Sequence, residues 1–405
     1  MTKKRIPFGT ITITKSAKER INESLTSGRV SGGKYLNEFE SKFAEYIGVK
    51  HAVAVSSGTD ALTLALSILR PRDIPPVYRY ILLPALTFIA TANAVINSGF
   101  KPIFIDIDKY TLNMDLNILN NSKIYMQKSM GIIPVHLMGN PVDMDKLKEI
   151  INPYMITIIE DAAEAHGTTY KNKRVGSIGE MGCFSTYLAH IISTIDGGVV
   201  TTNNDIYAKD LRSLRMHGRN CTCKQCVINT FGSKCDNRFK DGTDQRFLFD
   251  RIGYSSRMNE LEAAVGLGCL EEIDNIVHTR HINYIRIVDG LVQIPKFNEL
   301  FYLMNTYIKS EFSPHAFPII CKENKYFTRD EFSNYLEDNG IETRTLFASI
   351  PTQYKAYEYL GVPYGTFPNS EYVGNNGIHI GCHQDITKED CYYIVDTIAK
   401  FIRRF

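Results

Sequence analysis

The sequence predicts an α/β protein with two domains. The first is a large domain with a mostly parallel central sheet flanked by helices, and the second is a smaller α+β C-terminal domain. Short apolar runs, typical of buried strands, alternate with helix-compatible segments over the first part of the chain, which indicates βαβ units. A long helical stretch at 257–277 then precedes a region of mixed strand and helix patterns. We therefore expect domains at 1–275 and 276–405.

The individual elements follow from hydrophobic periodicity. The apolar residues of 36–47 recur at helical spacing, which predicts an amphipathic helix. A strand over 51–57 ("HAVAVSS") and a helix over 58–69 follow it. Further strand-like runs are "YILLPALTF" (80–88), "KPIFIDID" (101–108), "GIIPVHLMG" (131–139) and "MITIIEDAA" (155–163). The C-terminal domain is predicted from "FSPHAFPIICKE" (312–323), "RDEFSNYLEDNG" (329–340) and "DITKEDCYYIVDTIAKFI" (385–402).

Charge and hydropathy exclude several classes of protein. The 46 basic and 44 acidic residues leave a net charge of +2, which argues against nucleic acid as the main partner. No apolar run is long enough for a membrane span. The N-terminal stretch "MTKKRIPFGTITITK" lacks the apolar core of a signal peptide. We therefore expect a cytoplasmic protein without a membrane segment.

Nine cysteines are present, and their spacing separates them into two groups. Five are scattered and are typical of small buried apolar residues. The other four lie close together in a cysteine-rich insertion at about 215–240: Cys221, Cys223, Cys226 and Cys235. In a cytosolic chain such clustering indicates a metal site rather than disulfides.

Two short motifs suit an anionic, aromatic ligand. Ser57, Gly58 and Thr59 stand between a strand and a helix, where free N–H groups and the helix dipole favour a phosphate. Simple N-capping is the alternative interpretation. Asp161 ends a predicted strand, and ligands of open α/β sheets bind at that end. A cap or a salt bridge would also explain this carboxylate.

Together these segments resemble the sugar aminotransferase and dehydratase family of fold type I pyridoxal-phosphate enzymes, the DegT/DnrJ/EryC/StrS group. The resemblance covers nearly the whole chain and runs in one order through seven blocks: "YLNEFESKFAEYIGVKHAVAVSSGTDALTLAL", "LPALTFIATANAV", "PVHLMGNPVDMDKL", "IIEDAAEAHGTTY", "GGVVTTNN", "IGYSSRMNELEAAVGLGCLEEID" and "IETRTLF". It implies the fold type I architecture for the two predicted domains.

The resemblance also implies roles for single residues. Gly58 and Thr59 would hold the cofactor phosphate with Ser185 beside them, and Phe88 would stack on the cofactor ring. Asp161 would pair with the pyridinium nitrogen, which makes the ring an electron sink. The further positions are Glu164, where the aminotransferases have a glutamine near the ring hydroxyl, and Ser255, where the group commonly has an asparagine that reaches the partner subunit's phosphate. Sites shared across a homodimer are the rule in this fold.

His190, in "STYLAHIISTIDGG" (185–198), stands where the aminotransferases of the group carry their cofactor lysine. The nearest lysines, Lys173 and Lys209, lie outside the motif. Imidazole cannot form the persistent imine that a primary amine forms, so we expect a non-covalent cofactor, pyridoxamine or pyridoxal 5'-phosphate. Histidine can still accept and return a proton near neutral pH. A lone histidine is usually a packed or surface residue; at this position the resemblance favours a general base.

A histidine at this position marks the nucleotide-sugar 3-dehydratases of the group. One type resembles GDP-4-keto-6-deoxymannose 3-dehydratase, uses glutamate and has no metal. The other resembles CDP-4-keto-6-deoxyglucose 3-dehydratase and uses pyridoxamine phosphate with a 2Fe-2S cluster. The segment "RMHGRNCTCKQCVINTFGSKCDNRF" (215–239) resembles the cluster segment of the second type, with a longer gap before the third matching cysteine.

The expected cluster ligands are Cys221, Cys223, Cys226 and Cys235. Three of these match the pattern of the second type, and Cys226 would supply the fourth thiolate that such a cluster needs. The group's own fourth cysteine falls where this chain has Ala163. A zinc site and unligated thiols remain as alternatives. Two substrate-contact positions, Ile350 and Gln353, also depart from the second type.

The function that the resemblance implies is removal of the carbon-3 hydroxyl of a nucleotide-linked, CDP-favoured, 4-keto-6-deoxyhexose. The product would lead to a 3,6-dideoxyhexose of a surface polysaccharide such as the O-antigen of lipopolysaccharide. A flavin/iron–sulfur NAD(P)H reductase would donate the electrons. The alternatives are a metal-free, glutamate-dependent 3-dehydratase, a sugar aminotransferase, and a non-catalytic homologue that binds cofactor or sugar.

Overall fold

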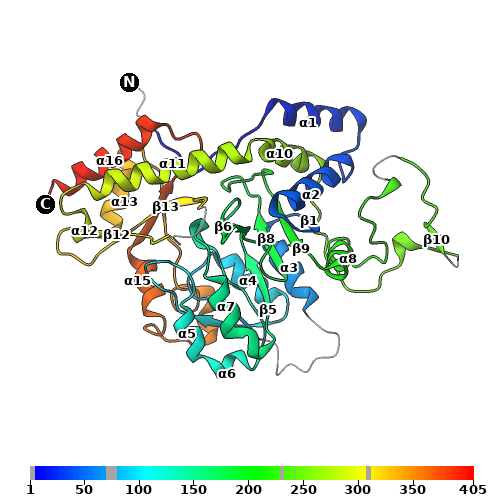
Figure 1. Ribbon diagram of the computed structural model, residues 1–405, viewed down its shortest axis with the longest axis horizontal. Coiled ribbons are helices and arrows are strands. Elements are labelled where there is room, and N and C mark those ends of the chain that lie inside the picture. Colours follow the sequence, from blue (N-terminus) through cyan, green and yellow to red (C-terminus); the bar gives the residue numbers. More distant parts are fainter. Residues whose placement is uncertain (1–4, 70–79, 229–231, 241, 307–311) are drawn as a thin grey trace.

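The computed structural model describes residues 5–69, 80–228, 232–240, 242–306 and 312–405 (Figure 1). Its centre is a seven-stranded sheet with the order β1-β9-β8-β5-β4-β2-β3. The strands are β1 (His51–Val55), β2 (Tyr80–Pro84), β3 (Lys101–Ile105), β4 (Ser129–Ile132), β5 (Thr157–Asp161), β8 (Met181–Ser185) and β9 (Gly198–Thr202). Only β9 runs antiparallel to its neighbours in this sheet. The predicted mostly parallel sheet is therefore confirmed.

Alternate residues of the strands contribute to two hydrophobic cores, one on each face of the sheet. On β1, Val53 and Val55 belong to the core that includes α3 (Gly58–Ile68), α4 (Ile89–Asn97) and α8 (Asp205–Leu214). Ala52 and Ala54 belong to the other core, which includes α2 (Lys34–Ile47), α7 (Met144–Ile151) and α10 (Glu260–Glu271). Helices therefore cover both faces, as the alternating sequence pattern predicts.

The amphipathic helix predicted at 36–47 is α2, whose apolar residues at helical spacing are buried. By contrast, the prediction of one continuous helix over 257–277 is wrong. Glu272 has non-helical backbone angles, so α10 ends at Glu271 and a separate helix, α11 (Ile273–Val292), begins. α11 extends well past the predicted end and lies alongside α16 (Lys388–Ile402) (Figure 1).

The C-terminal region forms a four-stranded antiparallel sheet with the order β12-β13-β15-β14. Its strands are β12 (Phe301–Leu303), β13 (Ala316–Cys321), β14 (Thr343–Thr345) and β15 (Gly377–Gly381), and α13 (Arg329–Asp338) and α15 (Pro368–Asn376) contact them. The N-terminal segment also reaches this region, because Ile6 forms a β-bridge with Ile341 and the Phe8 N–H donates to Glu342 at 3.0 Å. The domain limits near residue 275 stay a prediction.

The remaining elements are short or peripheral: α1 (Lys15–Ser27), α5 (Leu116–Asn121), α6 (Lys123–Met126), α12 (Phe297–Leu300), α14 (Ile350–Gln353), β6 (Thr169–Tyr170), β7 (Lys173–Arg174), β10 (Phe239–Lys240) and β11 (Thr243–Asp244). The segment that carries β10 projects from the body of the molecule beyond α8 (Figure 1). Among the described residues, no helix combines the length and the apolar character needed to cross a membrane.

Candidate active site

A cavity of about 690 Å³ lies where the parallel strands end. It is lined by residues that follow β1, β2 and β4, by the last residues of β5 and β8, and by residues of the C-terminal sheet. Eight of the predicted site residues line it: Ser57, Gly58, Thr59, Phe88, Asp161, Glu164, Ser185 and His190. The sheet topology therefore brings together side chains that are scattered along the sequence.

The phosphate side of the cavity is the turn between β1 and α3. Ser57 caps α3 by accepting the Asp60 N–H at 3.0 Å, so the capping interpretation of this serine is confirmed. Gly58 begins the helix, and a Cβ at this position would lie 2.6 Å from the Cβ of Ser185. Only glycine allows β8 and the N-terminus of α3 to approach this closely. The first turn of α3 thus faces the cavity beside the Ser185 hydroxyl.

Asp161 is the last residue of β5 and is 5% exposed. Its Oδ2 accepts the Thr91 hydroxyl at 2.9 Å, and its Oδ1 accepts the Ala163 N–H at 3.2 Å. Burial raises the pKa of Asp161, and these two hydrogen bonds oppose that rise. A cationic N–H group in the cavity would stabilise the charged form of this buried carboxylate.

Glu164 also lines this cavity and is buried. Its Oε2 accepts the Met138 N–H at 2.7 Å, and its Oε1 lies 3.9 Å from Nε2 of His315. Burial raises the pKa of Glu164 to about 8, so this side chain is mainly a neutral carboxylic acid at pH 7. It can therefore donate a hydrogen bond to a ligand.

His190 follows β8 in a turn closed by its own N–H to the Tyr187 carbonyl at 2.9 Å. Its Nδ1 is buried and has no hydrogen-bond partner among the described residues. Burial, and next the charges of Arg280 and Arg344, lower its pKa to about 3. The imidazole is thus neutral near pH 7, as a base must be before it accepts a proton. Its ring lies 4.8 Å from that of His315.

Several cavity residues are absent from the set predicted by sequence. Thr91 orients Asp161, while His315, Arg344 and His379 reach the cavity from the C-terminal sheet, and Phe8 comes from the N-terminal segment. Arg344 does lie in the "IETRTLF" block and His315 in the "FSPHAFPIICKE" run. Neither stretch carries a local signal that these side chains point toward His190.

Two predicted positions differ from the rest in exposure. Phe88 lines the cavity but is 56% exposed, and its ring lies 5.6 Å from that of Phe347. Ser255 is exposed and does not line the cavity; its backbone pairs with Met216 in an isolated β-bridge. The proposed reach of Ser255 to a partner subunit's phosphate stays a prediction.

The chain matches the DegT/DnrJ/EryC1/StrS aminotransferase family over residues 11–399. It belongs to this family. The lipopolysaccharide biosynthesis protein RfbH of Salmonella typhimurium is 31% identical, with 98% of this chain and 91% of that protein covered. The GDP-perosamine synthase of Caulobacter vibrioides is 32% identical, with coverages of 92% and 91%. A crystal structure of a GDP-4-keto-6-deoxymannose-3-dehydratase mutant with bound GDP-perosamine superposes with a TM-score of 0.86 at 27% identity, covering 97% and 100% of the two chains.

The cavity of this family member fits a pyridoxal-type cofactor. Gly58 lets the first turn of α3 lie against β8, which places the Ser185 hydroxyl beside the helix N-terminus, and Asp161 offers a buried carboxylate at a strand end. The unpartnered Nδ1 of His190 supplies a buried polar atom toward which a ligand can be directed. No lysine is among the described residues that line the cavity, and Lys173 and Lys209 are both exposed elsewhere. These features suit a cofactor held by non-covalent contacts.

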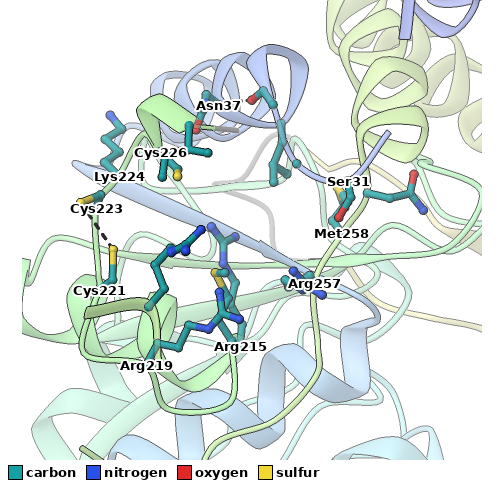
Figure 2. Close-up of a pocket in the computed structure, with 17 residues that line it drawn as sticks. Ser31, Asn37, Arg215, Arg219, Cys221, Cys223, Lys224, Cys226, Arg257 and Met258 are labelled. Atoms are coloured by element: carbon teal, nitrogen blue, oxygen red, sulfur yellow. Dashed lines mark hydrogen bonds between the residues drawn. The ribbon is translucent and has the colours of Figure 1, made fainter. Parts of the chain in front are cut away.

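The predicted cluster ligands do not assemble in the same way. The Sγ atoms of Cys221 and Cys223 lie 3.8 Å apart. However, no group of three or more His, Cys, Asp or Glu side chains within the described part of the chain is arranged to hold a metal ion. Cys221, Cys223 and Cys226 line a second pocket, and Cys235 does not (Figure 2). Residues 229–231 of the insertion lie outside the described residues. In this arrangement the thiols do not fit a 2Fe-2S cluster.

Proposed function

We propose that this family member is a nucleotide-sugar 3-dehydratase. It would remove the carbon-3 hydroxyl of a nucleotide-linked 4-keto-6-deoxyhexose with pyridoxamine or pyridoxal phosphate bound non-covalently. One observation carries the proposal: the buried, unpartnered imidazole of His190 lies in a cavity with Asp161 and Glu164, and no lysine lines the described part of that cavity. A family member without a lysine there lacks the amine on which ordinary transamination depends.

Different residues of the cavity would bind the cofactor and transfer the proton. Ser57, Gly58, Thr59 and Ser185 would bind the cofactor phosphate, and Asp161 would accept a hydrogen bond from the ring nitrogen. When bound, the cofactor supplies an electron-withdrawing ring that stabilises negative charge next to the bond that loses its proton. His190 would accept that proton at Nδ1 and later return a proton to the departing hydroxyl. Phe8 and Phe347 add apolar side chains to the wall of the cavity.

The electron source separates two forms of this reaction. The cysteine pattern in the sequence supports the iron–sulfur form with a flavin/iron–sulfur reductase, but the arrangement of the thiols among the described residues does not; the metal-free form with glutamate is the alternative. The likeness to RfbH supports a role in lipopolysaccharide biosynthesis. CDP as the nucleotide and a homodimeric assembly rest on the sequence resemblance alone.

We expect the purified protein to deoxygenate carbon 3 of a nucleotide-linked 4-keto-6-deoxyhexose in the presence of pyridoxamine phosphate. Mass spectrometry of the sugar would follow the reaction in two arms, one with glutamate alone and one with NADH and a flavin/iron–sulfur reductase. Iron content would accompany the second arm. Transfer of an amine to the sugar without loss of oxygen would instead establish an aminotransferase, and borohydride fixation of the cofactor to the protein would contradict non-covalent binding.

The substitution Asp161→Asn should lower the turnover rate strongly and change the free energy of unfolding little. The variant keeps the shape and the contact with Thr91 but loses the charge that would hold the ring nitrogen protonated. A hydrogen bond to a charged group contributes ~1.5–3 kcal/mol, so turnover should fall roughly 10- to 150-fold. Steady-state rates at saturating pyridoxamine phosphate test this. Thr91→Val is the matched control, since it removes one hydrogen bond to the carboxylate but keeps its charge, and it should cost less.

A further inference from the structure

A second pocket, of about 260 Å³, lies beside the cysteine-rich insertion (Figure 2). Five parts of the chain line it: residues 31–37 at the start of α2, 215–219 after α8, the cysteine segment 221–228, Arg246, and 257–259 before α10. Figure 2 places Cys221, Cys223 and Lys224 on one side and Ser31, Arg257 and Met258 on the other, with Arg215 and Arg219 between them. Among the described residues, it shares no lining residue with the active-site cavity.

Its lining is strongly cationic. Five basic side chains contribute to it, Arg215, Arg219, Lys224, Arg246 and Arg257, and none of the lining residues is Asp or Glu. Two of the five are neutralised from outside the pocket, since Arg215 pairs with the buried Glu40 and Arg246 pairs with Asp244 at 2.7 Å. The other three form no ion pair with a carboxylate in the described part of the chain.

Buried guanidinium nitrogens add a second, independent observation. The Nε atoms of Arg215 and Arg219 are buried and have no hydrogen-bond partner among the described residues. Buried polar groups in folded proteins are nearly always satisfied, so donors left without acceptors beside a cavity point to a missing acceptor. For arginine the matching acceptor is an oxyanion with several oxygens.

We propose that this pocket binds a phosphate-class oxyanion, with Arg219 and Arg257 as its principal ligands and the thiols of Cys221 and Cys223 beside it. The volume suits such a ligand. At about 260 Å³ the pocket is much larger than the space that one water molecule needs. Phosphate or diphosphate fits within that space, while the rest of a nucleotide would extend into solvent. Inorganic phosphate and a phosphorylated nucleotide share this chemistry and are separated by experiment.

The cysteines allow occupancy to be measured without any assay of activity. Cys221, Cys223 and Cys226 line the pocket, whereas Cys235 belongs to the same insertion but does not line it. An anion in the pocket should therefore slow alkylation of the first three thiols and leave Cys235 unchanged. Full-length protein would be labelled with isotopic iodoacetamide in phosphate, pyrophosphate or CDP, and the labelled peptides quantified by mass spectrometry. Sodium chloride at equal ionic strength is the reference.

Variants and calorimetry make the test specific. Arg219→Gln and Arg257→Gln should each weaken pyrophosphate binding roughly tenfold in isothermal titration calorimetry. Arg257→Lys should fall between these variants and the wild type, because it keeps the charge but not the forked donor geometry. Lys234→Gln is the matched control, since Lys234 is an exposed cation of the same insertion outside the pocket. Circular dichroism confirms that each variant is folded.

The outcomes are distinct. Protection by CDP at lower concentration than pyrophosphate would identify a phosphorylated nucleoside as the ligand, and equal protection would identify the phosphate group itself; both support the site. The proposal is overturned if millimolar pyrophosphate does not slow alkylation of the three thiols and shows no heat of binding in the calorimeter. It is also overturned if Cys235 is protected equally, or if Lys234→Gln weakens binding as much as Arg219→Gln. None of these readouts depends on dehydratase activity, so failure of the site and failure of the proposed reaction can be told apart.

Discussion

The His190→Asn variant is expected to lose dehydration by ~10²–10⁴-fold, the usual contribution of a positioned acid–base group. Asparagine keeps a polar side chain of similar reach but cannot accept a proton near neutral pH. The wild-type imidazole is neutral at pH 7, because burial and the charges of Arg280 and Arg344 lower its pKa. Single-turnover rates with pyridoxamine phosphate and a nucleotide 4-keto sugar measure the loss. Binding of the cofactor, followed by its absorbance, should persist.

The matched control is His166→Asn. His166 is also fully buried, and its ring lies 6.4 Å from that of His190, but it does not line the cavity. Its substitution should change the rate far less than that of His190. The pH profile adds a second readout: kcat/KM should hold as pH falls below 6.5, the ordinary pKa of histidine, and decline only as His190 takes up a proton. If the His190→Asn variant dehydrated the sugar at the wild-type rate, His190 would not be the general base.

Most site residues that the sequence predicts stand next to a strand. Apolar runs locate strands, and parallel strands end at one edge of a sheet, so the sequence alone indicates that Gly58 and Asp161 meet. It does not indicate the same for His315 and Arg344, because they come to the cavity from the C-terminal region, far away in the sequence. Contacts of this kind depend on tertiary structure and leave no periodic trace in the sequence. The same limit applies to the cysteines, whose spacing alone does not determine where their sulfurs point.

A buried network next to Asp161 holds the end of β5 in place. Glu160 is fully buried; its Oε1 accepts the N–H groups of Ile178 and Gly179 at 2.7 and 2.6 Å. Its Oε2 accepts the Gly176 N–H at 2.8 Å and contacts Nε2 of His136 at 3.0 Å. Because the Val142 N–H donates to Nδ1 of His136, the proton of this imidazole is on Nε2 and points at the carboxylate. One side chain thus satisfies four donors behind the active site.

Glu160→Ala should therefore destabilise the fold by ~3–5 kcal/mol, since it leaves buried donors without an acceptor. Denaturant unfolding measures this change. Glu180→Ala is the matched control: Glu180 accepts the N–H of Ile158 on the same strand at 2.7 Å but is itself exposed, so water can replace it at a cost of ~1 kcal/mol. Equal losses in the two variants would show that burial of the network does not matter.

The pH dependence of this loss gives the same network a second test. Burial alone would raise the pKa of Glu160, but His136 and the N–H groups of Gly179 and Gly176 outweigh it and hold the pKa below its ordinary value. A carboxylate with a depressed folded-state pKa stabilises the protein above its unfolded-state pKa of ~4.3, and this contribution is lost as the pH falls through the folded-state value. The difference in unfolding free energy between wild type and Glu160→Ala should thus be constant from pH 6 to 8 and shrink below about pH 4. A difference that stayed constant into the acid range would mean that the carboxylate acts by its shape and not by its charge.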